Sequence, residues 1–578
     1  MYPVYRRPYF RQWLKAPTRE ANTVRYPYPA RLFRQHDVFP LFILDGGAFF
    51  FTMEHLKGTT GADFLEALES GELLAPWMVD GRLQWDKVYD DTWTGGDRWK
   101  AEQHVWLNRL YFLLPIAQQA FRTGHKKWSR LWVRHFRAWS RAHPRPEGAP
   151  WTDGAKYVWR DMQVTWRLLV LLHSVFLLGR SKGLGRGDWA AVYDSILEHA
   201  EHVHAEAKAD FRDDRPGNHF LQKGMALILA GAFFPDLPRA HSYLTLGRKI
   251  IREQMRTEIY PDGGSIEASP SYSHFIARTY LDAHLALRAN GLPSIRGLEA
   301  CIRRQYAFLR ETTTPDGRTL QLGDSYNMDS ALDLRIASQL MLLGLPSGDP
   351  DGSRAFKESS FAVLRHGPLT AYMDGMPLGA WHCHFGKPNL LLYWNGAPVL
   401  VDSGCCNYDL PEHRDWFQKA PAHNVVLVEP IDGELNVSRA APPTFALEHF
   451  EATEEHAEAT MSHRHKQPGF RYVWTRTARL EGGALTLTDS IKSSAPARCT
   501  LVMHVAASRL RALRGGERID ASGDGWRLTI GEEVGSPVEF ARSRRPAMDA
   551  SNLLCDVPVV ALSREGRNVE FRYVCRFA

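Results

Sequence analysis

The sequence lacks the long apolar stretch that a membrane-spanning helix requires. No segment approaches about 18 uninterrupted apolar residues, so we expect no membrane span. The N-terminal segment MYPVYRRPYFRQWLKAP has basic side chains but lacks the apolar region of a secretory signal. A cytoplasmic location is therefore expected if Met1 is the native start, and a periplasmic or secreted one if a signal peptide has been removed.

Cysteine is scarce, and neither sign of charge is in large excess. The seven cysteines include no CxxC pair, and their odd number argues against a full disulfide framework, so we expect mostly reduced thiols. A net charge of +6, from 71 basic and 65 acidic residues, predicts no nucleic-acid partner but is compatible with an anionic substrate. Aromatic residues are plentiful, and they can stack on sugar rings as well as fill helical cores.

The order of sequence patterns predicts the domains. Residues 1–60 are rich in Pro, Tyr and Arg without a sustained period, and we interpret them as an N-terminal arm or cap. Between 61 and 350, apolar residues recur three and four apart. The predicted helices are 104–124, 158–179, 189–211, 218–234, 243–260, 271–291 and 298–313. Successive amphipathic helices of this kind favour a bundle, a solenoid or an α/α toroid.

From 351 to 578 the apolar period changes to two, which predicts an antiparallel β-sandwich. The predicted strands are 360–367, 370–375, 388–396, 398–404, 423–429, 472–482, 485–493 and 499–507. The boundary between the helical and the all-β domain lies near the loop 343–354.

Two segments place polar residues at the start of a predicted helix. GNHFLQKG (217–224) carries Asn218 and His219 where unpaired N–H groups and the helix dipole suit a carboxylate, although Asn218 can equally be a simple N-cap. YPDGGSIEASPSYSHF (260–275) leads a Gly-rich turn into a helix that carries Tyr272. Tyr272 can donate or accept a proton, or it can be a buried residue of a capped helix.

A third segment combines histidines with a carboxylate. His382 and His384 are two residues apart, so on a strand both project from one face. His384, Asp402 and His423 can meet on adjacent strands. Two histidines and one carboxylate that leave an open position suit Zn²⁺.

These segments, in this order, resemble the heparinase II/III-like polysaccharide lyases. The matching stretches are 106–124, NHF (218–220), 260–275, 382–384, GAPVLVDSG (396–404) and AHN (422–424). The resemblance implies an α+β multidomain fold, with an incomplete (α/α) toroid followed by an antiparallel β-sandwich. It also implies cleavage of a uronic-acid-containing glycan by β-elimination.

The resemblance also implies roles for single residues. Asn218, with His219 beside it, is expected to bind and neutralise the uronate carboxylate, and Glu267 is expected to contact substrate. Tyr272 is expected to give a proton to the leaving glycosidic oxygen. His382 is expected to complete the site from the sandwich domain, and Tyr408 matches a tyrosine that serves as base in some members.

The metal site and the base follow from the same resemblance. His384, Asp402 and His423 are expected to hold a metal, usually zinc with a structural role. Where H5 and O4 of the uronate share a face, Tyr272 or Tyr408 would move the proton; where they lie on opposite faces, His219 would be the base. Four family positions differ here, namely Gly386, Asn389, Ser403 and the pair Cys405–Cys406. These differences affect the substrate rather than the reaction.

Two other classes of function stay open from the sequence. A glycoside hydrolase on an (α/α) barrel needs two carboxylates, and Asp262, Glu267 and Asp324 are available. The chain can also be a non-catalytic glycan-binding protein, but the presence of Asn218, Tyr272 and His382 together would then have no explanation. The expected partner is an anionic uronate polysaccharide or oligosaccharide, from glycosaminoglycans, alginate or bacterial exopolysaccharides, and a homodimer is compatible with the sequence.

Overall fold

The computed structural model describes most of the chain from residue 107 onward. Besides short pieces between residues 66 and 85, the described ranges are 107–146, 158–179, 181–212, 217–341, 352–379, 382–406, 408, 410–438, 442–513, 518–523, 525–532, 539–549 and 553–577. The predicted arm, residues 1–60, lies outside them. The chain divides into two compact units. The first comprises Met1–Glu258, Phe275–Ile302 and Ile336–Leu343, and the second comprises Ile259–His274, Arg303–Arg335 and Gly344–Ala578.

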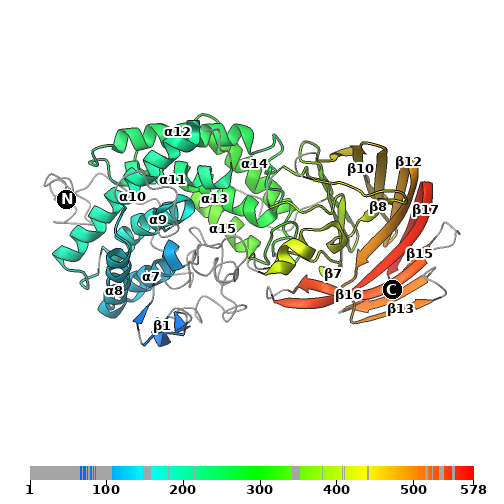
Figure 1. Ribbon diagram of the computed structural model, residues 1–578, viewed down its shortest axis with the longest axis horizontal. Helices are drawn as coiled ribbons and strands as arrows, with labels where there is room; N and C mark the ends of the chain where they lie inside the picture. The colour runs from blue at the N-terminus through cyan, green and yellow to red at the C-terminus, as the bar shows by residue number, and fades with distance from the viewer. Residues whose placement is uncertain are drawn as a thin grey trace. The chain divides into compact units, whose positions relative to one another are not determined.

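Helices dominate the first unit (Figure 1). Its complete helices are α7 (Leu113–Thr123), α8 (Lys126–Ala142), α9 (Asp161–Leu178), α10 (Arg186–Arg212), α11 (Asn218–Phe233) and α12 (Ala240–Thr257). Parts of α13 (Pro270–Ala289), α14 (Leu298–Glu311) and α15 (Ser330–Met341) also belong to it. Helix α7 packs against α8, α10 packs against both α9 and α11, and α11 packs most closely against α12. Glycine permits this approach, because a Cβ on Gly247 would lie 2.6 Å from the carbonyl oxygen of Gly224.

Helix α9 is apolar on nearly every side and lies at the centre of this packing. It contacts α7, α10 and α11. Its length and composition would also allow it to cross a membrane, but 89% of the helix is buried inside the protein. A helix that is hydrophobic all round is typical of such a core position.

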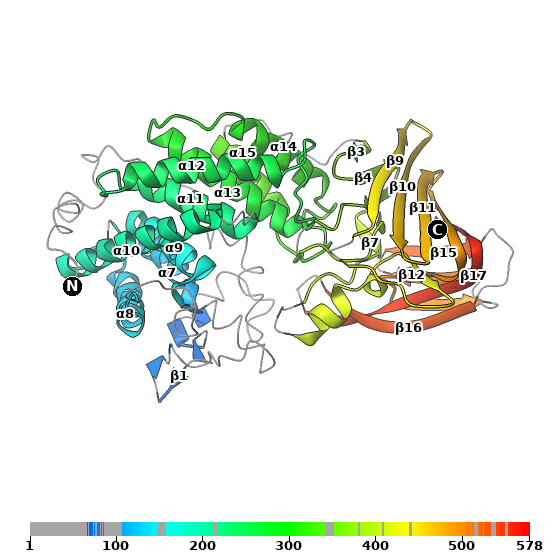
Figure 2. The ribbon, with the colours of Figure 1, turned by 45° about the horizontal axis from the view of Figure 1, so that its top comes forward.

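The second unit contains two antiparallel sheets (Figure 2). The five-stranded sheet is formed, in spatial order, by β3 (Arg354–Phe356), β4 (Phe361–His366), β5 (Leu369–Asp374), β6 (Asn389–Trp394) and β7 (Ala397–Leu400). The larger sheet has the order β13 (Arg509–Leu513), β14 (Arg518–Gly523), β15 (Trp526–Glu532), β17 (Leu554–Phe577), β12 (Ala484–His504), β11 (Phe470–Glu481), β10 (His456–Gln467) and β9 (Thr444–Ala452). Strand β16 (Glu539–Met548) pairs with β17, and β8 (Val426–Pro430) pairs with β12.

The inner faces of the two sheets share one apolar core. Leu364 and Leu392 contribute from the smaller sheet, and Met461, Trp474 and Leu487 contribute from the larger one. The period-two pattern in the sequence produces this arrangement, because successive side chains of a strand point to opposite faces. In β11, for example, buried residues alternate regularly with more exposed ones.

Two segments that precede the sandwich in the chain pack onto its smaller sheet. Ala268 from the first segment and Phe308 and Leu322 from the second join an apolar cluster with Phe361 and Tyr372 of β4 and β5. The segments 259–274 and 303–335 therefore belong to the same unit as the sandwich. This places the first turn of α13 in one body with the loops that carry the predicted histidines. The prediction that His382, His384 and His423 lie on strands is wrong, because His382 and His384 precede β6 and His423 precedes β8.

The predicted fold class is confirmed, and local differences have physical causes. The predicted helix 104–124 is interrupted at Leu110, which has a left-handed φ of 57°, so α7 begins only at Leu113. The predicted strands 485–493 and 499–507 are one strand, β12, with an irregularity between Lys492 and Ala497. The residues SSAP there resemble a turn, but the backbone accommodates them as a bulge. Helices α8 and α15 were not predicted.

Candidate active site

The first turn of α13 holds Tyr272 in a defined position. Ser269 occupies the N-cap position, where its carbonyl oxygen accepts a hydrogen bond from the Ser273 amide (2.9 Å) and its hydroxyl donates to the Asp324 carbonyl (2.9 Å). Pro270 follows at the first helical position, which proline favours. The Ser271 hydroxyl also accepts a hydrogen bond from the Tyr326 amide (2.9 Å). The Ser-Pro pair in the sequence thus starts the helix and fastens it to the loop 324–326.

Tyr272 contacts two of the other predicted catalytic residues. Its ring stacks on His382, with centroids 3.5 Å apart and an angle of 17° between the planes. Its hydroxyl lies 2.9 Å from the hydroxyl of Tyr408, so the two share a hydrogen bond. The structure therefore brings Tyr272, His382 and Tyr408 together, although more than 100 residues separate Tyr272 from the other two in the chain.

Glu267 holds His382. The Glu267 carboxylate lies 2.5 Å from Nδ1 of His382 and is itself nearly fully buried. This contact leaves Nε2 of the ring available for other partners. Gly323 makes the backbone approach possible, because it has a φ of 58° and a Cβ there would lie 2.6 Å from the His382 carbonyl. Glu267 was predicted to contact substrate, and in this structure its side chain orients the histidine.

Both tyrosine hydroxyls keep their protons at neutral pH. Burial, followed by the Asp324 carboxylate, raises the pKa of Tyr272 well above its ordinary value. The same two causes raise the pKa of Tyr408. A neutral hydroxyl in a water-poor site suits the donation of a proton to a leaving oxygen.

Asp324 is the centre of a buried polar cluster that the sequence did not predict as such. Its Oδ1 lies 2.8 Å from Nε2 of His384 and 2.9 Å from Nε2 of His413, and it accepts a hydrogen bond from the Cys405 thiol (3.4 Å). Burial raises the pKa of Asp324, but the hydrogen bonds from His384 and His413 outweigh this effect and hold the pKa below its usual range. The group is therefore a carboxylate anion beside the tyrosine pair.

A second carboxylate orients His423. Asp402 Oδ2 lies 2.6 Å from Nδ1 of His423 and also accepts from the Asn389 amide. The other oxygen of Asp402 accepts a hydrogen bond from the backbone amide of Gly404 (2.8 Å). Burial raises the pKa of Asp402, and His423 lowers it by more, so that this carboxyl is also ionised.

The histidine pair fits a metal ion. The rings of His384 and His423 have centroids 5.2 Å apart. Nδ1 of His384 and Nε2 of His423 are buried and have no hydrogen-bond partner among the described residues, whereas the opposite nitrogen of each ring contacts a carboxylate. Metal-binding histidines have this pattern, in which a carboxylate fixes the ring and the free nitrogen meets the metal. Gly386 leaves room for the His423 ring, because a Cβ there would lie 2.2 Å from it.

A neighbouring set of side chains offers an alternative metal site. Asp324, Cys405 and His413 are all buried, and their ligand atoms lie within 4.8 Å of one another. One carboxylate, one thiol and one histidine form a donor set that zinc accepts. Asp324, a member of this set, also contacts Nε2 of His384, so the two candidate sites are neighbours.

The first unit contains the other predicted catalytic pair. Asn218 and His219 occupy the first turn of α11, with Gly217 as the N-cap, so Asn218 is not the N-cap residue itself. Asn218 is buried, whereas the His219 side chain is 55% exposed. Nδ1 of His219 lies 2.6 Å from Asp161, a contact that leaves its other nitrogen for a ligand.

Asp161 is fixed by a buried ionic network. It begins α9 with a left-handed φ of 52°, which its contacts must stabilise. Lys223 lies 3.0 Å from Asp161, 3.3 Å from Glu206 and 2.5 Å from Asp210. Burial raises the pKa of Asp161, but His219 and Lys223 outweigh this and hold the pKa well below its ordinary value. The carboxylate that orients His219 is therefore ionised.

Comparisons with known proteins match both halves of the chain to one family. The family model "Heparinase II/III N-terminus" matches residues 74–342, and "Heparinase II/III-like, C-terminal" matches residues 348–552. Together they cover both the Asn218 and the Tyr272 segments and the sandwich histidines.

The chain belongs to the heparinase II/III-like family.

Individual relatives of this family are distant. A heparin-sulfate lyase of Bacteroides stercoris is 22% identical over 372 residues, which are 57% of this chain and 53% of that protein. An alginate lyase of Stenotrophomonas maltophilia is 32% identical over 144 residues, 22% of this chain and 18% of that protein. The chain thus spans about half the length, or less, of these curated relatives.

A solved structure supports the same fold. The crystal structure of a heparinase III superposes with a TM-score of 0.71 at 16% identity, covering 87% of this chain and 80% of that one. At this identity the likeness concerns the fold, a toroid followed by a β-sandwich. The heparinase II/III-like architecture therefore extends over most of this chain.

The three carboxylates available to a hydrolase of this fold all contact other groups of the protein. Asp262 accepts a hydrogen bond from the Ser359 amide (2.8 Å) and stabilises a turn. Glu267 contacts His382, and Asp324 contacts His384 and His413. His274, which follows Tyr272 closely, bonds to Asp333 and Ser330 and is a buried structural residue. Each of the three carboxylates Asp262, Glu267 and Asp324 therefore has a partner within the protein.

Proposed function

We propose that this protein is a lyase that cleaves a uronic-acid-containing glycan by β-elimination and leaves a 4,5-unsaturated uronate end. The observation that carries the proposal is the Tyr272–Tyr408 hydroxyl pair, with His382 stacked on Tyr272 and held by Glu267. Membership in the heparinase II/III-like family supports the same reaction.

The reaction requires one proton acceptor and one proton donor. A base removes H5, the electrons of the C5–H bond form the C4–C5 double bond, and the C4–O4 bond breaks as O4 takes a proton. The raised pKa of Tyr272 suits it as the donor to O4. His382 contacts the face of Tyr272 and can donate from Nε2 to the uronate carboxylate, where charge accumulates as H5 leaves.

The base depends on the stereochemistry of the uronate. Where H5 and O4 share a face, the paired hydroxyls of Tyr272 and Tyr408 can relay the proton, one accepting while the other donates. Where they lie on opposite faces, His219 is the base, oriented by Asp161. Asn218 at the start of α11 is suited to bind the carboxylate, because helix N-termini favour anions.

The substrate class we propose is a glycosaminoglycan of the heparin and heparan sulfate type. The heparin-sulfate lyase of B. stercoris supports it, since its similarity extends over 57% of this chain. The alginate lyase match is shorter, at 22% of this chain. Alginate is therefore the second polymer to test.

We also propose a structural zinc ion, bound by His384 and His423 with Asp402 as ligand or as the group that orients His423. The buried ring nitrogens without partners support this assignment. Bound zinc would fix the loop that carries His382 and His384 and would supply no group to the elimination itself.

Ultraviolet absorbance of the new double bond tests the function directly. Purified protein is incubated with heparan sulfate, its unsulfated backbone, other glycosaminoglycans and alginate. We expect absorbance to rise on heparan sulfate, and Tyr272→Phe, which keeps the ring stacking, to lower the rate at least about 100-fold. New reducing ends without absorbance would indicate hydrolysis and would overturn the proposal.

A further inference from the structure

The outer face of the larger sheet carries a group of basic residues that the reaction does not use. Arg464 on β10, Val473 on β11 and Lys492 on β12 are directly opposite one another in register. Lys466 on β10 faces Arg471 on β11 two residues further along. Because side chains two apart point to the same side of a strand, all four cations share one face. We call Arg464, Lys466, Arg471 and Lys492 the basic face.

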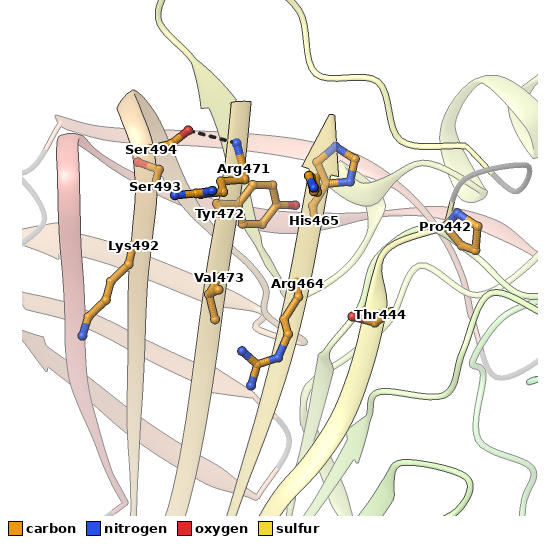
Figure 3. Close-up of a pocket in the computed structure, with 11 residues that line it drawn as sticks. Pro442, Thr444, Arg464, His465, Arg471, Tyr472, Val473, Lys492, Ser493 and Ser494 are labelled. Carbon is orange, nitrogen blue, oxygen red and sulfur yellow. Dashed lines mark hydrogen bonds between the residues drawn. The ribbon is translucent and has the colours of Figure 1, made fainter. Parts of the chain in front are cut away.

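These residues line a surface pocket of about 530 Å³ (Figure 3). Figure 3 shows Arg464, Val473 and Lys492 side by side on three neighbouring strands, with Arg471 near the start of β11 and Ser494 within β12. Thr444, Ser493 and Ser494 also line the pocket, and none of its described lining residues carries a carboxylate. The pocket shares no residue with the cluster around Tyr272.

The basic face is not neutralised within the described part of the chain. Glu448 pairs with Arg464 at 2.8 Å, but Lys466, Arg471 and Lys492 form no ion pair among the described residues. Lys466 and Arg471 are directly opposite each other, an arrangement of like charges that destabilises a sheet. The fold does not benefit from this pairing, whereas a bound anion would offset the repulsion.

The same face continues as a surface of hydroxyl groups. Thr475 and Ser490 are half-buried in the next cross-strand row, where Ser462 is buried and donates its hydroxyl to Glu448. Thr460 and Thr477 in the row beyond share a hydrogen bond of 2.8 Å. A row of hydroxyls beside a group of cations matches the chemistry of an anionic sugar chain, which presents hydroxyls, carboxylates and sulfates.

We propose that the basic face is a second binding site for an anionic glycan, which holds a segment of a long substrate chain apart from the bond that is cleaved. The proposal rests on the proposed lyase function for the identity of the glycan. Two linked contacts raise the affinity for a long chain without changing the chemical step. The basic face therefore acts on long chains and leaves short ones unaffected.

The test compares two triple variants in a Tyr272→Phe background, which keeps the glycan intact. One is Lys466→Ala, Arg471→Ala and Lys492→Ala. The control, Lys357→Ala, Arg509→Ala and Arg527→Ala, removes the same charge from exposed positions outside the pocket. Calorimetric titration with long heparan sulfate is expected to show about tenfold weaker binding for the first triple and no change for the control. With a tetrasaccharide the three proteins should bind alike.

Further ligands separate the possible causes. Unsulfated heparan backbone shows whether sulfates or carboxylates are recognised. Equal loss with inorganic polyphosphate would reveal a general polyanion surface and would overturn the glycan assignment, as would unchanged binding of long heparan sulfate. Glycan binding is measured here without turnover, whereas the absorbance assay measures the lyase reaction. A wrong assignment of the basic face can therefore be distinguished from a wrong assignment of the lyase function. Thermal unfolding of each variant confirms that the sandwich is intact.

Discussion

The ring of Tyr272 lies flat against the ring of His382, with 3.5 Å between their centroids. Nδ1 of His382 is held by the Glu267 carboxylate. The first turn of α13 and the loop between β5 and β6 thereby bring the Tyr272 hydroxyl and the His382 imidazole together. The geometry depends on Glu267, because its carboxylate sets which nitrogen of His382 faces the protein.

We therefore predict that Glu267→Gln lowers kcat about 10- to 100-fold, since the amide no longer fixes one tautomer and orientation of the His382 ring. The control is Glu311→Gln, which changes another buried glutamate of the same unit, one that pairs with Arg365 at 2.8 Å. Glu311→Gln should lower the melting temperature and leave kcat unchanged. Equal kcat for Glu267→Gln and the wild type would show that His382 needs no orienting carboxylate.

The contact of Asp161 with His219 predicts an effect that depends on the substrate. Asp161→Asn keeps the size of the side chain but removes the charge that fixes and polarises His219. We expect at least about a tenfold loss of kcat/KM on uronates with H5 and O4 on opposite faces, such as iduronate. Glucuronate bonds, where these groups share a face, should be cleaved at the wild-type rate. The absorbance assay on defined oligosaccharides measures both, and a uniform loss on the two would contradict the assignment of His219 as base.

Two substitutions can show which of the two neighbouring sets of side chains binds zinc. If His384 and His423 hold the ion, His423→Ala should remove zinc measured by elemental analysis and lower the melting temperature, whereas Cys405→Ser should retain zinc. The opposite result would place the metal on Asp324, Cys405 and His413. Removal of zinc by a chelator should destabilise the wild type more than His423→Ala, since a structural metal contributes to folding.

Buried histidines predict that the protein loses stability in mild acid. Burial, followed by the charge of Arg278, lowers the pKa of His173 in α9 to about 3. In the unfolded chain this histidine has a pKa near 6.5, so below that pH it binds a proton that it does not bind in the folded state. The free energy of unfolding therefore falls as the pH decreases from about 6.5 towards 3. Between pH 7 and pH 5 this residue alone contributes a loss of about 2 kcal/mol. Denaturant unfolding of His173→Leu should show a correspondingly smaller loss, and an unchanged pH dependence would contradict this explanation.

The sequence predicted those parts of the site that lie in short, ordered motifs. Tyr272 follows a Ser-Pro helix start, and Asn218 and His219 follow a Pro-Gly pair, so their placement at helix N-termini could be foreseen. The change of apolar period near residue 351 likewise predicted where the sandwich strands begin.

The Asp324 cluster could not be predicted, because its members come from separate parts of the chain. Asp324, Cys405 and His413 lie in loops or irregular helix, where no period indicates which side chains will meet. The signal available was the run Leu-Gly-Asp-Ser-Tyr at 322–326, in which Gly323 permits a close backbone approach. Asp161 was missed for a similar reason, since its contact with His219 bridges two helices 58 residues apart in sequence.

The long strand β17, which pairs with β12, β15 and β16, is an interior strand of the larger sheet although it follows the other strands of that sheet in the chain. While the ribosome is still translating residues before Leu554, the edges of β12 and β15 that β17 will cover remain without their partner. The sandwich core can therefore close only after translation has reached the end of β17. A nascent chain that stalls before this point would expose unpaired strand edges, and chaperone binding at this stage would protect it from aggregation.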